Sequence, residues 1–304
     1  MNDLMIVAGP CSVDKDNIED ILAIADITVL SPEGVKKKAV MGTRVVGLKS
    51  RTDLAMSGEG MGIDFPIFMR NMDMLLSGKS GADMEQLPSI LIAQEIIRKT
   101  KMLVATEIMS PLIQLPLFER IIPQGKLLIW NPAVNQLGWP MHKMGVFAKR
   151  NGWYVGLKNG KWLGGETGGA TTMEKAWVGL SNYAALNEIE HRDRLVFIHR
   201  GVDIPEKGEY RSLPVHHVAR RVKSVTGAKM FFDPSHTLGP KLRDNIVSAV
   251  IDAMKEKISD KEYLYDGILI EAGRSKTDTK QHITIQELND LCQELSKWRN
   301  LVSP

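Results

Sequence analysis

Two groups of residues in this chain carry side chains that could do chemistry, and both groups follow short apolar runs. The first group supplies one thiol, one imidazole and two carboxylates: Cys11, His236, Glu271 and Asp278. This mixture suits one divalent ion of borderline softness, such as Mn²⁺, Fe²⁺, Co²⁺ or Zn²⁺, and is too soft for Mg²⁺ or Ca²⁺. No pair among the four has the compact spacing of a ligand motif, so spacing alone favours a packing role for Cys11.

The second group is cationic and also follows apolar runs: Arg44, Lys49, Arg51, Lys158 and Arg200. Arginine binds phosphate as a fork and lysine binds it as a point charge, so five such groups at one place would hold more than one anionic group. For any single residue, a position on a solvated basic rim is an equally good interpretation. That interpretation is weaker for five residues that all follow apolar runs.

The elements that must position these residues alternate along the chain. Eight short apolar runs are expected to be strands: Leu4–Ala8, Val40–Leu48, Met102–Ile108, Leu127–Ala133, Trp153–Leu157, Leu195–His199, Lys229–Phe232 and Gly267–Glu271. Helical patterns follow them: Asn17–Ala25, Ile90–Thr100, Pro111–Ile122, Met141–Arg150, Met173–Asn187, Val215–Val225, Leu242–Lys257 and Ile285–Leu301. Eight alternating units predict an α/β fold, a single (β/α)₈ barrel, because eight parallel strands close a barrel. An open doubly wound sheet is the alternative, but charged residues after nearly every strand favour the barrel and its single active end.

Two long glycine-rich stretches, Ser50–Pro88 and Lys158–Thr172, have no clear pattern and follow strands. We expect them to be irregular loops over the mouth of the barrel, where they could act as lids, and tolerated surface insertions are the alternative. No linker interrupts the pattern. Residues 1–304 are therefore predicted to form one catalytic barrel without a separate regulatory domain.

The composition excludes several classes of protein. A formal net charge of +3 does not favour nucleic acid or a membrane as a partner. Two cysteines make no disulfide framework, and Cys292 falls at a core position of the last predicted helix. Because the chain shows neither a signal peptide nor a long apolar span, we expect a cytoplasmic protein. His216 and His217 are interpreted as surface histidines whose side chains point apart.

The motifs at the strand ends, taken in order, resemble those of a known family. They are Gly9-Pro10-Cys11-Ser12, Arg44 with Lys49-Ser50-Arg51-Thr52, Ala105-Thr106-Glu107, Lys158-Asn159-Gly160, Arg200-Gly201, Phe232-Asp233-Pro234-Ser235-His236 and Thr277-Asp278-Thr279-Lys280-Gln281. The set resembles 3-deoxy-7-phosphoheptulonate (DAHP) synthases and, less closely, 3-deoxy-8-phosphooctulonate synthase. Each motif is short, but the ordered set is specific and extends from Met5 to about Leu291.

The resemblance implies an enzyme that condenses phosphoenolpyruvate with erythrose 4-phosphate and releases phosphate, the first step of the shikimate pathway in aromatic amino acid biosynthesis. It implies one divalent metal ion held by Cys11, His236, Glu271 and Asp278. Phosphoenolpyruvate would be bound by Arg44, Lys158, Arg200 and the backbone at Ala133, and the aldose phosphate by Lys49, Arg51 and Thr52. Catalytic roles fall to Lys158, Glu107, His236 and Cys11. We also expect a homo-oligomer, either a dimer or a tetramer.

The chain departs from the family pattern at the proposed substrate site. Val134 stands where the family has a phosphate-binding arginine, Ser50 replaces a proline, and Asp53 adds a carboxylate near the aldose motif. Loss of one bidentate arginine weakens binding by about 1.5–3 kcal/mol if nothing replaces it. Two alternatives therefore stay open: a related synthase that uses another aldose phosphate, such as arabinose 5-phosphate, and a non-catalytic barrel that binds a metal or ligand.

Overall fold

The computed structural model describes residues 3–31, 34–49, 60–167, 170–186, 188–277 and 279–304. Five residues discussed above lie outside these ranges: Ser50, Arg51, Thr52, Asp53 and Asp278.

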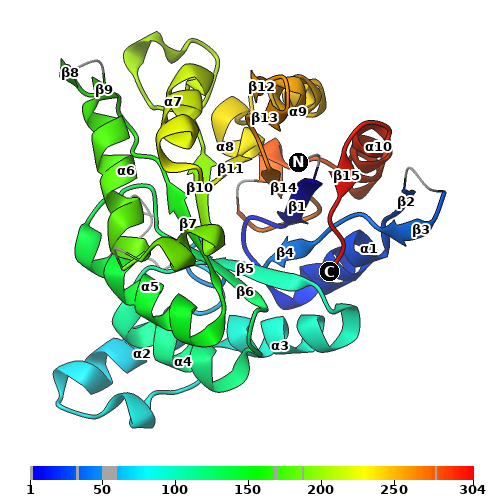
Figure 1. Ribbon diagram of the computed structural model, residues 1–304. Coiled ribbons are helices and arrows are strands. Elements are labelled where there is room, and N and C mark those ends of the chain that lie inside the picture. Colours follow the sequence, from blue (N-terminus) through cyan, green and yellow to red (C-terminus); the bar gives the residue numbers. More distant parts are fainter. Residues whose placement is uncertain (1–2, 32–33, 50–59, 168–169, 187, 278) are drawn as a thin grey trace.

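Eight parallel strands form a closed barrel (Figure 1). They are β1 Asp3–Gly9, β4 Gly42–Arg44, β5 Leu103–Glu107, β6 Leu127–Trp130, β7 Tyr154–Lys158, β10 Leu195–His199, β11 Lys229–Phe232 and β14 Gly267–Glu271. The barrel closes where β14 pairs with β1, from Met5 opposite Gly267 to Gly9 opposite Glu271. This pairing confirms the predicted (β/α)₈ barrel and excludes the open sheet. The strands β4 and β6 are shorter than the apolar runs that predicted them.

Helices lie outside the strands, and each predicted helix is present within a few residues of its expected bounds (Figure 1). They are α1 Ile18–Asp26, α3 Pro88–Thr100, α4 Pro111–Ile121, α5 Gly138–Asn151, α6 Thr172–Ala184, α7 His216–Thr226, α9 Ile246–Lys255 and α10 Ile285–Ser296. The last helix ends earlier than predicted because the chain then forms a short strand, β15 Asn300–Leu301, which pairs with the start of β1. Cys292 lies in the core, as predicted. Among the described residues, no helix has the length and apolar character needed to cross a lipid bilayer.

The stretch Ser50–Pro88 was predicted to be irregular, and this was wrong for part of it. Residues Phe65–Leu76 form a helix, α2, which begins after Asp64 and carries a proline in its first turn. Its apolar residues Phe65, Phe68, Met69, Met72, Leu75 and Leu76 recur at helical spacing, although the residues it buries are Phe68 and Asn71. In the second stretch, Glu166–Thr167 and Ala170–Thr171 pair as a small hairpin, β8 and β9. The role of both stretches as lids stays a prediction.

His216 is not the surface residue that was predicted. Its Nδ1 lies 2.7 Å from the hydroxyl of Tyr265, and the same hydroxyl lies 2.7 Å from Nδ1 of His199. The three rings pack together with Phe232, the last residue of β11. His217 is exposed, so the two neighbouring histidines do point apart.

A buried carboxyl group, Asp64, anchors the chain before α2 to the start of α3. It accepts hydrogen bonds from the backbone N–H of Ser89 at 2.8 Å and from the Ser89 hydroxyl at 2.5 Å. Burial raises the pKa of Asp64 from its ordinary value of 3.8 to about 6. Between these two pH values the folded chain holds a proton that the unfolded chain releases. The contribution of Asp64 to the free energy of unfolding is therefore fully present below about pH 4 and is lost as the pH rises through 6.

We expect Asp64→Asn to remove this pH dependence, because the amide stays neutral and can still bond both groups of Ser89. Relative to the variant, the wild-type free energy of unfolding should fall by about 3 kcal/mol between pH 4 and pH 7. Urea unfolding at several pH values measures the difference, and Asp73→Asn on the exposed face of α2 is the control. Parallel pH profiles for the wild type and Asp64→Asn would contradict the prediction.

Candidate active site and metal centre

Alternation along the strands carries the candidate residues to one mouth of the barrel. Side chains inside the barrel form a separate apolar cluster that includes Leu103 and Ala105 of β5, Val196 and Ile198 of β10, and Leu269 of β14. Glu107, Arg200 and Glu271 each come two residues after the last cluster member of their strand, so they lie on the same face of that strand. Arg44 and Lys158 are likewise the final residues of β4 and β7. All five therefore point inward at the carboxyl ends of parallel strands, where barrels of this kind hold their sites.

Three buried cations surround one side of this mouth. Arg44 is 1%, Lys158 4% and Arg200 6% exposed. The indole of Trp130 lies beneath two of them, 5.7 Å from the Arg44 guanidinium carbon and 5.2 Å from Lys158 Nζ. Within the described part of the chain, the buried Nη1 atoms of Arg44 and Arg200 have no hydrogen-bond partner. Because an unpaired buried donor is costly, this arrangement favours an anion with several acceptor oxygens.

Lys158 also faces a carboxylate. Its Nζ lies 3.8 Å from Oε1 of Glu107, which is itself 7% exposed. Burial lowers the pKa of Lys158; the carboxylates of Glu107 and Asp233 oppose this shift, and the charges of Arg44 and Arg200 add to it. Burial is the largest of these causes. A lysine whose pKa is lowered in this way is better able to give and take a proton.

Asparagine side chains fix the ends of the strands that carry these cations, and sequence reasoning gave them no role. Asn131 accepts a hydrogen bond from the backbone N–H of Lys158 at 2.9 Å, and Asn159 accepts one from the N–H of Arg200 at 2.8 Å. Gly201, next in the chain, has φ +75, and a Cβ there would lie 2.5 Å from the carbonyl oxygen of Ser212. These contacts hold the backbone of two predicted binding residues in place.

The remaining predicted substrate residues that the structure describes differ in exposure. Lys49 is buried, and its Nζ donates to the carbonyl oxygen of Cys11 at 3.4 Å. Ala133 is half-buried, and its carbonyl oxygen accepts from the amide of Gln136 at 3.1 Å. Val134 is 59% exposed. A side chain at that position has room to be longer, so the missing arginine has not been replaced by a packed apolar contact.

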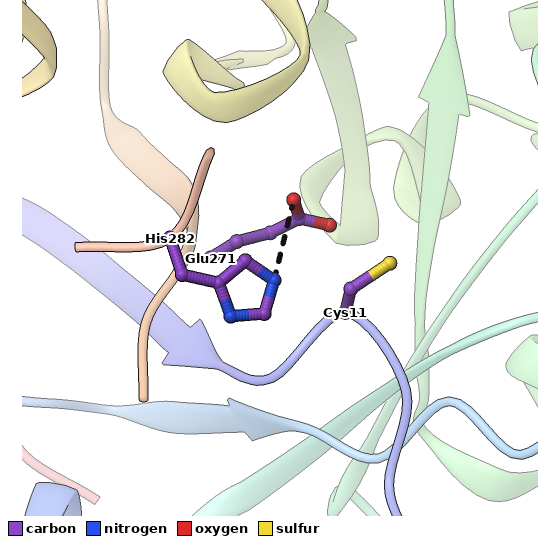
Figure 2. Close-up of side chains that lie close together, drawn as sticks. All are labelled: Cys11, Glu271 and His282. Carbon is purple, nitrogen blue, oxygen red and sulfur yellow. Dashed lines mark ion pairs between the residues drawn. The ribbon is translucent and has the colours of Figure 1, made fainter. Parts of the chain in front are cut away.

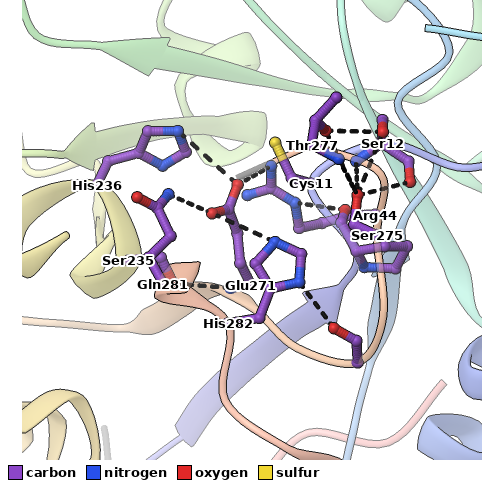
Figure 3. A network of polar contacts seen from close by, with 12 residues as sticks. Cys11, Ser12, Arg44, Ser235, His236, Glu271, Ser275, Thr277, Gln281 and His282 are labelled. Carbon is purple, nitrogen blue, oxygen red and sulfur yellow. Dashed lines mark hydrogen bonds and ion pairs between the residues drawn. The ribbon is translucent and has the colours of Figure 1, made fainter. Parts of the chain in front are cut away.

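Glu271 is the centre of a second group of contacts, which Arg44 joins to the cations (Figure 3). Its Oε1 accepts from Arg44 Nη2 at 2.9 Å, and its Oε2 accepts from the amide of Gln281 at 2.5 Å. Burial by itself raises the pKa of the Glu271 carboxyl, but His236, Arg44 and His282 more than offset this, so that its pKa lies below the ordinary value. The carboxylate is therefore ionised and joins the cationic group to the histidines.

His236 approaches Glu271 from the start of the short helix α8 (Pro234–Leu238). Its Nδ1 lies 3.0 Å from Oδ1 of Asp233, and its Nε2 lies 3.8 Å from Oε1 of Glu271. A carboxylate that accepts from Nδ1 leaves the lone pair on Nε2, which is how metal-binding histidines are commonly held. Burial lowers the pKa of His236 well below its usual value, which keeps the ring neutral.

Three side chains have ligand atoms that all lie within 4.8 Å of one another: Cys11, Glu271 and His282 (Figure 2). Cys11 and Glu271 were predicted as metal ligands, whereas His282 was missed, although it directly follows the motif that ends at Gln281. All three are buried. A thiolate, a carboxylate and an imidazole are donors that Fe²⁺, Co²⁺ and Zn²⁺ accept, so the residues present fit a divalent ion. The predicted ligand Asp278 lies outside the described residues, and its neighbour Thr277 hydrogen-bonds Ser12 at 2.8 Å, beside Cys11.

The fold of this chain is similar to that of solved structures. A crystal structure of phospho-2-dehydro-3-deoxyheptonate aldolase (DAHP synthase) from Thermotoga maritima superimposes with a TM-score of 0.68 at 19% sequence identity, and the match covers 97% of this chain and 69% of that one. The fold is that of DAHP synthase. A truncated form of 3-deoxy-D-arabino-heptulosonate 7-phosphate synthase from Thermotoga maritima gives a TM-score of 0.65 at 18% identity, covering 97% of this chain and 86% of that one. No family model and no curated protein matches the sequence.

Proposed function

We propose that this chain is a metal-dependent synthase that condenses phosphoenolpyruvate with an aldose phosphate, with erythrose 4-phosphate as the preferred aldose. The reaction would be that of the first step of the shikimate pathway, carried out by residues 1–304 as one catalytic barrel. The observation that carries the proposal is the buried cation group of Arg44, Lys158 and Arg200, which contacts the candidate metal centre through the ion pair between Arg44 and Glu271.

The cation group suits phosphoenolpyruvate, which has a carboxylate and a phosphate close together. The guanidinium groups of Arg44 and Arg200 each present a buried Nη1 donor without a described partner. Three buried positive charges favour tight binding of a ligand that carries two anionic groups. Lys49, with Arg51 and Thr52 of the following motif, would bind the aldose and its phosphate.

In the proposed reaction, a bond forms between C3 of phosphoenolpyruvate and the aldehyde carbon of the aldose, and the aldehyde oxygen takes up a proton. Water adds at C2, and the bond between C2 and the phosphate oxygen breaks, so inorganic phosphate leaves. Lys158 lies next to Glu107 at 3.8 Å, and this pair would move the protons that these steps require. The buried indole of Trp130 excludes water from the floor of the site.

Cys11, His236, Glu271 and Asp278 would hold the divalent ion, as the family resemblance implies. When bound, such an ion polarises a carbonyl oxygen or orients a water molecule. The protein's own contribution is to keep its ligands deprotonated and oriented. Asp233 does this for His236, and Arg44 and Gln281 do it for Glu271.

Phosphate release from phosphoenolpyruvate tests the proposal directly. Chelator-treated protein should release little phosphate, and adding Mn²⁺, Fe²⁺, Co²⁺ or Zn²⁺ should restore release that depends on an added aldose. A panel of erythrose 4-phosphate, arabinose 5-phosphate and ribose 5-phosphate separates the leading substrate from the longer sugars. A protein that binds phosphoenolpyruvate but releases no phosphate with any aldose would favour the non-catalytic barrel.

We expect Val134→Arg to tighten the binding of phosphoenolpyruvate. Val134 is 59% exposed, so an arginine at this position can be accommodated without disturbing the core, and the family resemblance implies that it would meet the phosphate. One added fork to phosphate should lower the dissociation constant about tenfold. Isothermal titration with and without Mn²⁺ measures the change, and Val134→Gln, a long neutral side chain, is the control. Equal tightening by both variants would show that charge is not the cause.

A further inference from the structure

His282 has no place in the ligand set that the family resemblance implies, yet its imidazole lies at the candidate metal centre. The side chain is 6% exposed and comes from the segment between β14 and α10. Its Nε2 lies 3.7 Å from Oε2 of Glu271, whereas His236 approaches the other oxygen of the same carboxylate. Glu271 therefore has one histidine beside each of its oxygen atoms (Figure 3).

Backbone pairing fixes this position. The segment that leaves β14 returns to it, and Ala272 and Ile283 form a parallel bridge. The N–H of Ile283 donates to the carbonyl oxygen of Glu271 at 3.1 Å, and the N–H of Gly273 donates to that of Ile283 at 3.0 Å. His282 is thus held next to the strand that carries Glu271 by main-chain hydrogen bonds that do not depend on its own side chain.

The ring is also oriented as a ligand would be. Its Nδ1 lies 2.8 Å from the carbonyl oxygen of Gly273. Since a carbonyl oxygen can only accept, Nδ1 carries the hydrogen and Nε2 carries the lone pair. That lone pair is on the side of the ring that faces Glu271, and the thiol of Cys11 lies on the same side (Figure 2).

The spacing of the three donors fits one ion. In a tetrahedral zinc site with bonds of about 2.0–2.3 Å, the ligand atoms lie about 3.3–3.8 Å from one another. The donors of Cys11, Glu271 and His282 are all within 4.8 Å of one another, so side-chain shifts of about 1 Å bring them to bonding distance.

We propose that His282 is a ligand of the divalent ion in this chain, together with Cys11 and Glu271. The inference rests on the proposed function in one respect, that the barrel mouth holds a metal ion. With His236 as a further ligand, the described residues would supply a thiolate, a carboxylate and two imidazoles. Such a donor set favours Zn²⁺, Co²⁺ and Fe²⁺ over Mn²⁺.

The variant His282→Asn tests this, with Co²⁺ alone as the probe. The asparagine Nδ2 takes the place of the ring Nδ1 and can still donate to Gly273, but nothing replaces Nε2. After removal of metal from the full chain, Co²⁺ titration should give an affinity at least tenfold weaker than that of the wild type. The ligand-field bands should change, while the thiolate-to-cobalt charge-transfer band should remain. Cys11→Ser should lose that band, and His217→Asn, at an exposed position, should match the wild type.

A second measurement needs no variant to fold. In wild-type protein with ¹⁵N-labelled histidine, Zn²⁺ should shift the Nε2 resonances of two buried rings if His282 and His236 both bind the ion. Unchanged Co²⁺ affinity and spectrum in His282→Asn, or a zinc-induced shift of the His236 ring without one of the His282 ring, would overturn the inference. A wild-type protein that binds no Co²⁺ would overturn both the inference and the metal dependence of the proposed function. Tight Co²⁺ binding that is lost in His282→Asn, in a protein that releases no phosphate, would support the inference and contradict the proposed function.

Discussion

Replacing Lys158 with methionine should lower the rate of phosphate release about a thousandfold. The variant keeps the length of the side chain above Trp130, but it removes the ammonium that lies 3.8 Å from Glu107. Loss of a positioned proton donor or acceptor lowers a rate by about 10²–10⁴. Glu107 would also be left as a buried carboxylate with one positive partner fewer, so binding of phosphoenolpyruvate should weaken as well. Steady-state phosphate release and isothermal titration separate the two effects.

Two further variants show which property of Lys158 matters. Lys158→Arg keeps the positive charge but cannot give up its proton at ordinary pH. It should therefore bind phosphoenolpyruvate nearly as well as the wild type and remain slow. Lys161→Met, three residues later at an exposed position, should leave the rate unchanged. If Lys158→Met lowered the rate less than tenfold, the lysine would have no part in proton transfer.

Much of this site follows from the sequence because strand alternation is regular. Glu107 and Glu271 come two residues after the buried Ala105 and Leu269, so a parallel barrel must place them at its mouth. The same reasoning placed Lys158 and Arg200 correctly without any side-chain geometry.

His282 and Trp130 could not be assigned in this way. His282 lies at the site because a bridge between Ala272 and Ile283 returns the chain to β14. A single bridge of this kind leaves no periodic pattern in the sequence, so it could not be predicted. Trp130 is buried, and its ring forms the floor beneath Arg44 and Lys158. Helix α2, by contrast, could have been predicted, because its apolar residues recur at helical spacing; much of that apolar surface is exposed, including Met69 and Leu76. A sequence pattern predicts on which face of a strand or helix a side chain lies, but not which side chains from other elements contact it.

Glu271→Gln should have the largest combined effect on stability and metal binding. The carboxylate accepts from Arg44 on one oxygen and from Gln281 on the other. An amide has one oxygen and one NH₂ group, so in either orientation a donor would face a donor. Arg44, 1% exposed, would also lose the counter-charge beside it. Breaking a buried ion pair by removing one partner costs about 3–5 kcal/mol, so the free energy of unfolding should fall by about that amount.

Urea unfolding in the presence of a chelator measures this loss without any contribution from bound metal. Glu85→Gln is the matched control, because its pair with Arg70 is exposed on both sides and should contribute little to the free energy of unfolding. The double variant Arg44→Met, Glu271→Gln removes the unpaired charge and should recover part of the lost stability. It should not recover Co²⁺ binding, since the negative charge of the Glu271 carboxylate is still absent. Recovery of both would show that Glu271 acts on the metal centre only by neutralising the charge of Arg44. Recovery of stability alone would identify its carboxylate as a ligand.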